Sequence, residues 1–167
     1  MTMEPLWAPW RLSYVAAARP PAAGDLCFIC SGLADSDDRR HQIVLRAPRS
    51  VVMLNRFPYN NGHLLIAPRA HKGTLHELDA EELLETMETL RRMVRVLDDA
   101  MHPDGYNIGL NLGHAAGAGL PGHLHWHVVP RWHGDTNFMP VLADTKVIAQ
   151  SLDALFDLLT TRIQAPG

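Results

Sequence analysis

Residues 122–130 read Gly-His-Leu-His-Trp-His-Val-Val-Pro, and the spacing of the histidines in this stretch decides the fold around it. His123, His125 and His127 alternate with apolar residues, a period of two that predicts a β-strand over residues 123–129. The apolar residues between and after the histidines are expected to face the core: Leu124, Trp126 and Val128. The three imidazoles would then form a row on the other face. Because imidazole changes charge near neutral pH, such a row suits nucleophilic attack, proton transfer or metal binding.

Strand geometry limits what this row can do. A strand rises roughly 3.3 Å per residue, so neighbouring histidines would lie about 7 Å apart and the outer two about 13 Å apart. Zinc ligands all lie about 2 Å from the ion, so three histidines on one regular strand could not easily share a metal. The spacing therefore favours different roles for the three imidazoles. A metal site that uses two of them, or a polar strand face without chemistry, stays open as an alternative.

Composition bounds the class of protein. A chain of 167 residues that is 47% hydrophobic can form one well-packed domain. A formal charge of −3 gives no general attraction to nucleic acid or to a membrane surface. The first residues lack the basic end and apolar run of a signal peptide, and no apolar run approaches the roughly 20 residues that cross a bilayer. We therefore expect a soluble cytoplasmic protein that binds neither nucleic acid nor membrane.

Along the sequence, strands are expected before and after one long helix. Apolar residues around a turn at Pro48 predict a hairpin within Ile43–Leu54, and further strands are expected at His63–Ala67 and Tyr106–Leu112. The helix is expected over Asp79–Met101, because Asp79 is a good N-cap and Glu82 is placed to complete a capping box. An apolar stripe at helical spacing is expected to face the core: Leu83, Met87, Leu90, Val94, Leu97 and Met101. A second amphipathic helix is expected over Lys146–Ile163.

A glycine-rich loop, Gly113–Gly122, leads into the histidine strand. Glycines such as Gly117 and Gly119 let the backbone approach a ligand and present N–H groups, which suits phosphate oxygens. Beside it, the middle histidine, His125, is the natural nucleophile, and its attack on phosphorus would give a covalent phosphoramidate. It must be neutral and held in one tautomer, so a carbonyl or another imidazole is expected to hold its second ring nitrogen.

Both cysteines of the chain lie in the stretch Cys27-Phe-Ile-Cys30. So few cysteines make a disulfide scaffold a poor explanation. A thioredoxin-like redox pair is possible, but residues 31–40 are polar and turn-rich, and no helix is expected there. Half of a zinc site, completed by two ligands from elsewhere, is the favoured interpretation.

The stretch 123–129 resembles the signature of the histidine triad (HIT) superfamily of nucleotidyl hydrolases and transferases. Residues 55–68 (Asn-Arg-Phe-Pro-Tyr-Asn-Asn-Gly-His-Leu-Leu-Ile-Ala-Pro) resemble the first half-site of that family, and residues 107–111 with 116–117 resemble the segment before the triad. The resemblance implies an α+β, HIT-like fold: an antiparallel sheet of about five strands, one long helix and a C-terminal helix. It implies a single domain over 1–167, with an N-terminal strap (1–26), a HIT core (27–131) and a C-terminal extension with a helix (132–167).

Within the family, residues 7–11 and 130–138 look most like a bacterial branch of diadenosine tetraphosphate phosphorylases. That resemblance implies that His125 becomes adenylylated, while His127 and His123 orient it and contact phosphate or the leaving group. It also implies that Asn55 and Asn111 hold ribose and phosphate and that His63 lies beside the nucleotide. The chain departs from many relatives in having Ala-Gly-Leu at 118–120, where a Ser or Gln would contact phosphate, so backbone N–H groups must substitute there.

The cysteines also gain partners by resemblance. In the related galactose-1-phosphate uridylyltransferases, a Cys-x-x-Cys pair binds zinc with a histidine after the half-site strand and the first triad histidine. The matching positions here are Cys27, Cys30, His71 and His123. Two cysteines and two histidines would make a closed, structural tetrahedral zinc site. The alternative is that the thiols are free and His71 is a surface residue.

The leading hypothesis is an enzyme that cleaves dinucleoside polyphosphates through adenylyl-His125, with phosphate as co-substrate. A hydrolase of the same nucleotides or of adenosine phosphoramidates is the second hypothesis. A nucleotide-binding sensor without turnover is the third, from a different class. The resemblance also implies a homodimer.

Overall fold

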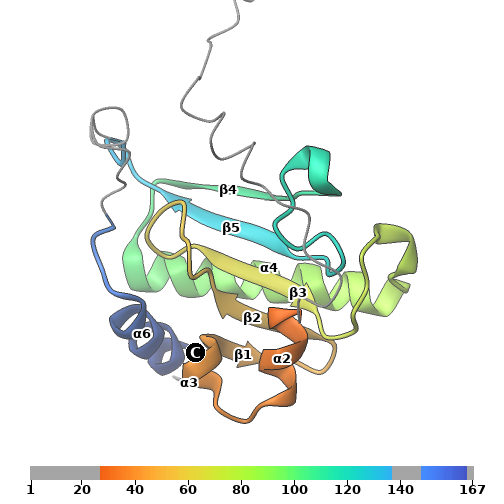
Figure 1. The fold of residues 1–167 in the computed structure, drawn as a ribbon. Helices are drawn as coiled ribbons and strands as arrows, with labels where there is room; N and C mark the ends of the chain where they lie inside the picture. The colour runs from red at the N-terminus through yellow and green to blue at the C-terminus, as the bar shows by residue number, and fades with distance from the viewer. Residues whose placement is uncertain (1–26, 137–147, 165–167) are drawn as a thin grey trace, which may run out of the picture.

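The computed structural model describes residues 27–136 and 148–164, which form the α+β architecture that the sequence predicts. Five antiparallel strands make one sheet in the order β1-β2-β3-β5-β4 (Figure 1). The strands are β1 (Ile43–Arg46), β2 (Ser50–Leu54), β3 (Leu64–Pro68), β4 (Gly105–Leu110) and β5 (Trp126–Arg131). The helices are α2 (Phe28–Ala34), α3 (Asp38–His41), α4 (Ala80–Met101) and α6 (Leu152–Gln164), with short 3-10 turns η1 (Leu75–Glu77) and η2 (His114–Ala116). The expected strap, residues 1–26, lies outside the described residues, as do residues 137–147.

The two faces of the sheet carry separate apolar clusters. On one face, α4 and α6 pack against inward residues of the strands, among them Val52, Ile66, Trp126 and Val128. On the other face, Ile29 of α2 packs on a second cluster, which includes Ile43, Val51, Met53 and Ala67. In Figure 1, α4 runs behind the sheet, and α2 and α3 lie beside β1. The face opposite α4 therefore bears the rest of the outward-pointing strand residues, and these include His127.

The long helix begins where its capping residues predict. The Asp79 carboxylate accepts from the Glu82 N–H (2.8 Å), and the Glu82 carboxylate accepts from the Asp79 N–H (2.9 Å). This reciprocal pair satisfies two amides that the helix itself cannot bond. The helix ends at Met101, and the left-handed backbone of the next residue, His102 (φ 48°), turns the chain into the loop before β4.

The expected apolar stripe of α4 is wrong at its N-terminal half. Leu83 and Met87 are 43% and 37% exposed. The buried side chains of the helix are Leu97, as expected, and four residues outside the expected stripe: Glu82, Thr86, Thr89 and Met93. Polar partners across the interface explain the difference: the Thr89 and Ser50 hydroxyls lie 2.9 Å apart and hydrogen-bond in the buried layer. A helix face can bury polar groups when each finds such a partner.

Three boundaries differ from the expectations. Helices α2 and α3 occupy residues 28–34 and 38–41, where only turns were expected. The C-terminal helix begins at Leu152 rather than at residue 146, and the Ser151 hydroxyl accepts from the Ala154 N–H (3.2 Å) at its start. Strand β5 begins at Trp126, three residues after the predicted start.

Pro68 of β3 has no N–H to extend the ladder, and its carbonyl oxygen accepts a hydrogen bond from the His123 ring. No helix among the described residues is long and apolar enough to cross a membrane.

Candidate active site

A cleft of about 480 Å³ opens on the face of the sheet opposite α4. This volume lies in the range of roughly 300–1,000 Å³ that small-molecule sites span. Its apolar lining includes Phe28, Met53, Leu54, Phe57, Leu65 and Leu120, and its polar lining includes Arg40, His41, Asn55, Tyr59, His125 and His127. An apolar wall with a few convergent polar groups is the arrangement expected for a heterocyclic ligand with a polar end. We call this space the main cleft.

The His125 ring is fixed in one tautomer by the backbone. Its Nδ1 lies 2.8 Å from the His123 carbonyl oxygen, and because a carbonyl can only accept, Nδ1 carries the proton. The lone pair of the neutral ring is therefore on Nε2. The residue is buried, with 8% of its surface exposed, and it lines the main cleft. A neutral imidazole with one free, oriented nitrogen is the arrangement that nucleophilic attack requires.

His127 is oriented from behind by a chain of hydrogen bonds. The Tyr59 backbone N–H donates to His63 Nδ1 (3.0 Å), so the neutral His63 ring carries its proton on Nε2. That Nε2 donates to His127 Nδ1 (2.9 Å), which leaves the His127 proton on its own Nε2. Burial, with a further contribution from His125, lowers the pKa of His127 to about 4, so the ring is neutral near pH 7. His127 therefore offers an N–H donor beside the His125 ring, whose centroid is 5.1 Å away.

The loop that carries Tyr59 is anchored to the end of β5. The Asn60 side-chain amide donates to the Asp135 carboxylate (2.8 Å) and to the Pro130 carbonyl (3.1 Å). The Arg131 guanidinium donates to both carboxylate oxygens of Asp135 (2.6 and 2.8 Å). These bonds hold the pKa of the Asp135 carboxyl well below its usual range. These contacts fix Asn60, the residue next to Tyr59. They therefore also fix the Tyr59 backbone amide, which donates to His63.

A second cluster lies behind the cleft, at the start of α2. Ligand atoms of Cys27, Cys30, His71 and His123 all lie within 4.8 Å of one another, so the four residues could hold a metal ion. Nδ1 of His123 is 3.2 Å from the Cys27 sulfur and 3.5 Å from the Cys30 sulfur, and Nδ1 of His71 is 3.2 Å from the Cys30 sulfur. Ligands of one tetrahedral zinc ion are separated by about 3.3–3.8 Å, so these contacts fit a single central cation.

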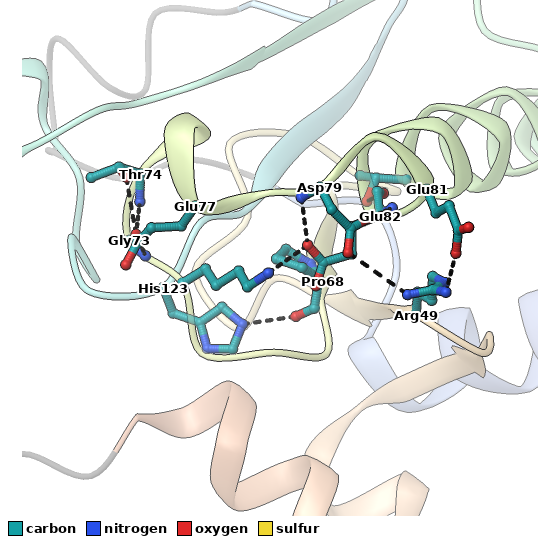
Figure 2. Close-up of polar contacts among 11 residues, drawn as sticks. Arg49, Pro68, Gly73, Thr74, Glu77, Asp79, Glu81, Glu82 and His123 are labelled. Carbon is teal, nitrogen blue, oxygen red and sulfur yellow. Dashed lines mark hydrogen bonds and ion pairs between the residues drawn. The ribbon is translucent and has the colours of Figure 1, made fainter.

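The protonation of this cluster also suits a metal. His123 Nε2 donates to the Pro68 carbonyl (2.8 Å; Figure 2), which leaves the Nδ1 lone pair directed at the sulfurs. Burial, with hydrogen bonding and charge from Cys27, raises the pKa of Cys30 to about 11. Two adjacent thiolates are thus unfavourable unless a cation lies between them.

Comparison with known proteins identifies the architecture. Residues 37–134, more than half of the chain, match the family described as "HIT domain". This chain belongs to the HIT family. It is 36% identical over 163 residues to "AP-4-A phosphorylase" of Mycobacterium tuberculosis, a match that covers 95% of this chain and 84% of that relative. The prediction of a HIT protein near the phosphorylase branch is confirmed.

Solved structures share the HIT fold. A hypothetical histidine triad nucleotide-binding protein from Sulfolobus tokodaii superposes with a TM-score of 0.66 at 24% identity, covering 83% of this chain and 92% of that one. A Zn-bound histidine triad family protein from Mycobacterium smegmatis gives a TM-score of 0.60 at 23% identity, covering 90% and 91%. At these identities, the likeness concerns the fold.

The HIT motif histidines divide between two places. His125 and His127 face the main cleft, whereas the His123 ring turns into the cysteine cluster, because residues 123–125 precede β5. His63 lies behind His127 and is buried rather than lining the cleft. Asn111 lines a smaller neighbouring hollow on the far side of His127.

The other expected nucleotide contacts reach the cleft in different ways. Asn55, Gly117 and Gly119 line it. The Asn55 Oδ1 accepts from the Phe57 N–H (2.9 Å), so this side chain is already oriented. The Gly117 N–H donates to the His114 carbonyl (2.9 Å) and is not available to phosphate. Within the described chain, no backbone carbonyl accepts from Gly119, whose amide is the better candidate for an anion.

Several cleft residues carry no signal in the sequence. Arg40 and His41 come from α3, and Phe28 comes from α2, both in a region that was expected to be turns. Tyr59 stacks on His127 (ring centroids 5.6 Å apart, interplanar angle 18°) and borders the cleft. It lies inside the half-site motif, but no periodicity singled it out.

The segment that carries His71 is tied to the start of α4. The Lys72 ammonium pairs with the Glu82 carboxylate (2.6 Å), and this contact lowers the pKa of Glu82. The Lys72 carbonyl accepts from the Leu124 N–H (2.7 Å), next to His123. Figure 2 shows Glu82 bonded back to Asp79 in the same region. The long helix therefore helps to place both histidines of the cysteine cluster.

Proposed function

We propose that this protein cleaves diadenosine tetraphosphate and similar dinucleoside polyphosphates by phosphorolysis, through a covalent adenylyl-His125 intermediate. The observation that carries the proposal is the buried His125 ring, whose Nδ1 is held by a carbonyl and whose Nε2 is left for attack in the main cleft. Similarity to the M. tuberculosis phosphorylase over 95% of the chain supports the substrate class.

In the first step, the His125 Nε2 lone pair attacks the α-phosphorus of the bound nucleotide. A P–N bond forms, the anhydride P–O bond breaks, and the electron pair leaves with the oxygen of the departing ATP. The His127 Nε2–H is the donor nearest to His125 in the chain of hydrogen bonds, and it stabilises the charge on that oxygen. Asn55 and the Gly119 amide line the same cleft and hold the nucleotide.

In the second step, inorganic phosphate attacks the adenylyl phosphorus. The P–N bond breaks and returns its electron pair to Nε2, and ADP is released. The total is therefore diadenosine tetraphosphate plus phosphate giving ATP plus ADP. Dividing one displacement into two lets a single imidazole act first as nucleophile and then as leaving group.

We also propose that Cys27, Cys30, His71 and His123 bind structural zinc. The support is the mutual distance of their ligand atoms and the tautomer of His123. A closed site of this kind supplies folding free energy rather than chemistry. It would tie the start of α2 to the backbone that orients His125.

We propose further that the protein works as a cytoplasmic homodimer. The two thiols suit a reducing compartment. In the described sheet, β4 is an edge strand, and its Ile108 is 45% exposed. Antiparallel pairing of two such edges about a two-fold axis would satisfy the backbone groups at the edge of β4 and leave the sheet face that bears His127 open.

One assay tests the reaction. The protein is incubated with diadenosine tetraphosphate, with and without phosphate, and the products are separated by chromatography. ADP plus ATP formed only with phosphate is the expected result. AMP plus ATP without phosphate would instead indicate the hydrolase, and binding without turnover would indicate the sensor.

A variant pair tests the nucleophile. His125→Ala is expected to bind nucleotide without turnover, and mass spectrometry of quenched wild-type mixtures is expected to find adenylate on the His125 peptide. His76→Ala, at an exposed histidine of η1, is the matched control and should retain activity. Full activity of His125→Ala would refute the assignment.

A further inference from the structure

A second hollow of about 250 Å³ adjoins the main cleft. It is lined by residues 107–111, along β4 and just after it, together with Tyr59, His127 and Val129. Tyr59 and His127 also line the main cleft, so these two side chains form the shared wall. We call this second space the side hollow. Its volume is below the roughly 300 Å³ at which sites for whole small molecules begin, which suits part of a ligand.

The strand register builds the side hollow around a glycine. Gly109 of β4 lies opposite His127 of β5, and Asn107 lies opposite Val129. Because side chains alternate along a strand, Asn107 and Gly109 share the face that bears His127. A Cβ built at Gly109 would meet no atom within 4 Å, so the missing side chain leaves open space beside the His127 ring.

The lining offers hydrogen-bond donors without negative charge. Asn107 Oδ1 accepts from the Arg131 guanidinium (2.7 Å), so the free part of that amide is its NH₂ group. Asn111 adds a second amide, and no carboxylate is found among the residues that line the side hollow. Tyr59 contributes an aromatic face. Amide donors beside an aromatic ring suit the phosphoryl and ribose oxygens and the base of a nucleotide.

The main cleft and the side hollow lie on either side of the His127 imidazole, which would meet the leaving oxygen. The His127 proton is on Nε2, so the scissile bond of a nucleotide in the main cleft is expected to point toward His127. Whatever departs from phosphorus must continue past that ring. The side hollow begins there.

We propose that the side hollow binds the departing half of a dinucleoside polyphosphate, the nucleoside polyphosphate that is released when His125 is adenylylated. This inference rests on the proposed function and adds a subsite to it. The subsite makes the enzyme selective for substrates with a nucleotide leaving group. A substrate that loses only a small group, such as an adenosine phosphoramidate losing ammonia, gains nothing from it.

Filling the hollow is the direct test. Gly109→Val adds a branched side chain that suits a strand and occupies the space beside His127. We expect kcat/KM for diadenosine tetraphosphate to fall about tenfold or more, which corresponds to about 1.4 kcal/mol of lost transition-state binding. For adenosine 5′-phosphoramidate, kcat/KM should stay within about twofold. Asn107→Ala should show the same selectivity with a smaller loss.

Gly105→Val is the matched control. Gly105 also lies in β4, and a Cβ there also meets nothing within 4 Å, but it pairs with Arg131 and does not line the side hollow. It should leave both substrates unaffected, which separates filling of the hollow from any general effect of valine in the edge strand. An equal loss on both substrates in Gly109→Val, or no loss on either, overturns the proposal.

A binding measurement keeps the inference separate from the reaction. In a His125→Ala background, which cannot form the intermediate, calorimetry should show diadenosine tetraphosphate binding more tightly than AMP, and adding Gly109→Val should remove the difference. If the wild-type protein cleaves neither substrate, the proposed function fails. If it cleaves both and Gly109→Val does not discriminate between them, only the subsite fails.

Discussion

Asn60 offers a test of how the histidines are oriented, because its side chain bonds to Asp135 and Pro130 and only its backbone carbonyl meets His63, accepting from the His63 N–H (3.3 Å). Its side chain is 7% exposed and makes two hydrogen bonds, one to the Asp135 carboxylate and one to the Pro130 carbonyl. Asn60→Ala removes both bonds and releases the neighbouring Tyr59 amide, which donates to His63 Nδ1. The variant is therefore expected to lose both stability and turnover, for separate reasons.

The loss of stability follows from the two partners. A hydrogen bond to a charged group contributes about 1.5–3 kcal/mol and one to a neutral carbonyl about 0.5–1.5 kcal/mol, so Asn60→Ala should cost about 2–4 kcal/mol. Asp135 keeps its Arg131 partner and is not left as an isolated charge. The loss of turnover comes from His63: without the Tyr59 amide, its Nδ1 is held only by the longer contact from the Asn55 NH₂ group (3.2 Å), which weakens the tautomer that donates to His127. We expect kcat to fall about tenfold, part of the roughly 10²–10⁴ that a positioned proton donor supplies.

Three measurements on one variant separate these effects. Urea unfolding gives the free energy, steady-state kinetics gives kcat and KM, and ¹⁵N NMR of the imidazoles reports which nitrogen of His127 carries the proton. Asp104→Asn is the control, since the Asp104 carboxylate anchors the same turn through the His133 N–H (2.7 Å) but does not bond Asn60. It should cost less stability than Asn60→Ala, because the amide oxygen of the substituted side chain can still accept from the His133 N–H. Unchanged kcat and an unchanged His127 tautomer in folded Asn60→Ala would refute the orienting chain.

Further predictions concern the core, the metal and pH. Leu97→Ala, at a fully buried position of α4, should cost about 2–5 kcal/mol in chemical unfolding while leaving KM unchanged, and a cost under about 1 kcal/mol would contradict the core assignment. Elemental analysis of protein purified under reducing conditions should find zinc, and Cys30→Ser should lose it and unfold at a lower temperature; wild-type protein without metal would refute the zinc proposal. The pKa of His127 is about 4 when folded and 6.5 when unperturbed, so its contribution to stability is present above pH 6.5 and is lost as pH falls toward 4. Urea unfolding at about pH 7.5 and about pH 5 should therefore show a smaller fall in stability for His127→Gln than for the wild type, and equal falls would contradict a neutral buried ring.

The parts of the fold that could be predicted are those stabilised by contacts between residues close together in the sequence. The start of α4 was predictable because Asp79 and Glu82 cap the helix with bonds that span three residues. The hairpin at Pro48 was predictable because turn chemistry is local and the flanking apolar runs are short. In both cases the stabilising contact and the signal are the same residues.

The buried face of α4 could not be predicted, because its partners are remote. Thr89 reads as a surface residue until Ser50, 39 positions earlier, is placed against it. Leu83 and Met87 have the hydrophobicity and the spacing of core residues, and yet they face outward in this chain. Helix α2 was missed for a related reason: at seven residues it is too short to be stable alone, and it forms where Ile29 packs on the sheet.

The histidine motif was predicted in its chemistry but not in its geometry. Alternation correctly put Leu124, Trp126 and Val128 in the core, but it also implied one continuous row of imidazoles. The row breaks at His123, since the Pro68 carbonyl and the two cysteines draw that ring away from the cleft. A period of two describes the backbone only as far as the ladder continues, and here the ladder ends at Ile66 opposite Trp126.

This break makes His123 important, because the same residue then contacts the cysteine cluster through its ring and His125 through its carbonyl oxygen. Its Nδ1 faces the sulfurs, its Nε2 is bonded to Pro68, and its carbonyl oxygen holds Nδ1 of His125. A rotation of the His123 backbone would remove the acceptor that keeps the His125 lone pair on Nε2. The ring contacts resist that rotation from two directions. A cation bound by the four residues of the cysteine cluster would therefore stabilise the reactive tautomer of His125 without approaching the nucleotide, which is a physical reason for a structural metal site to lie directly behind a nucleophile.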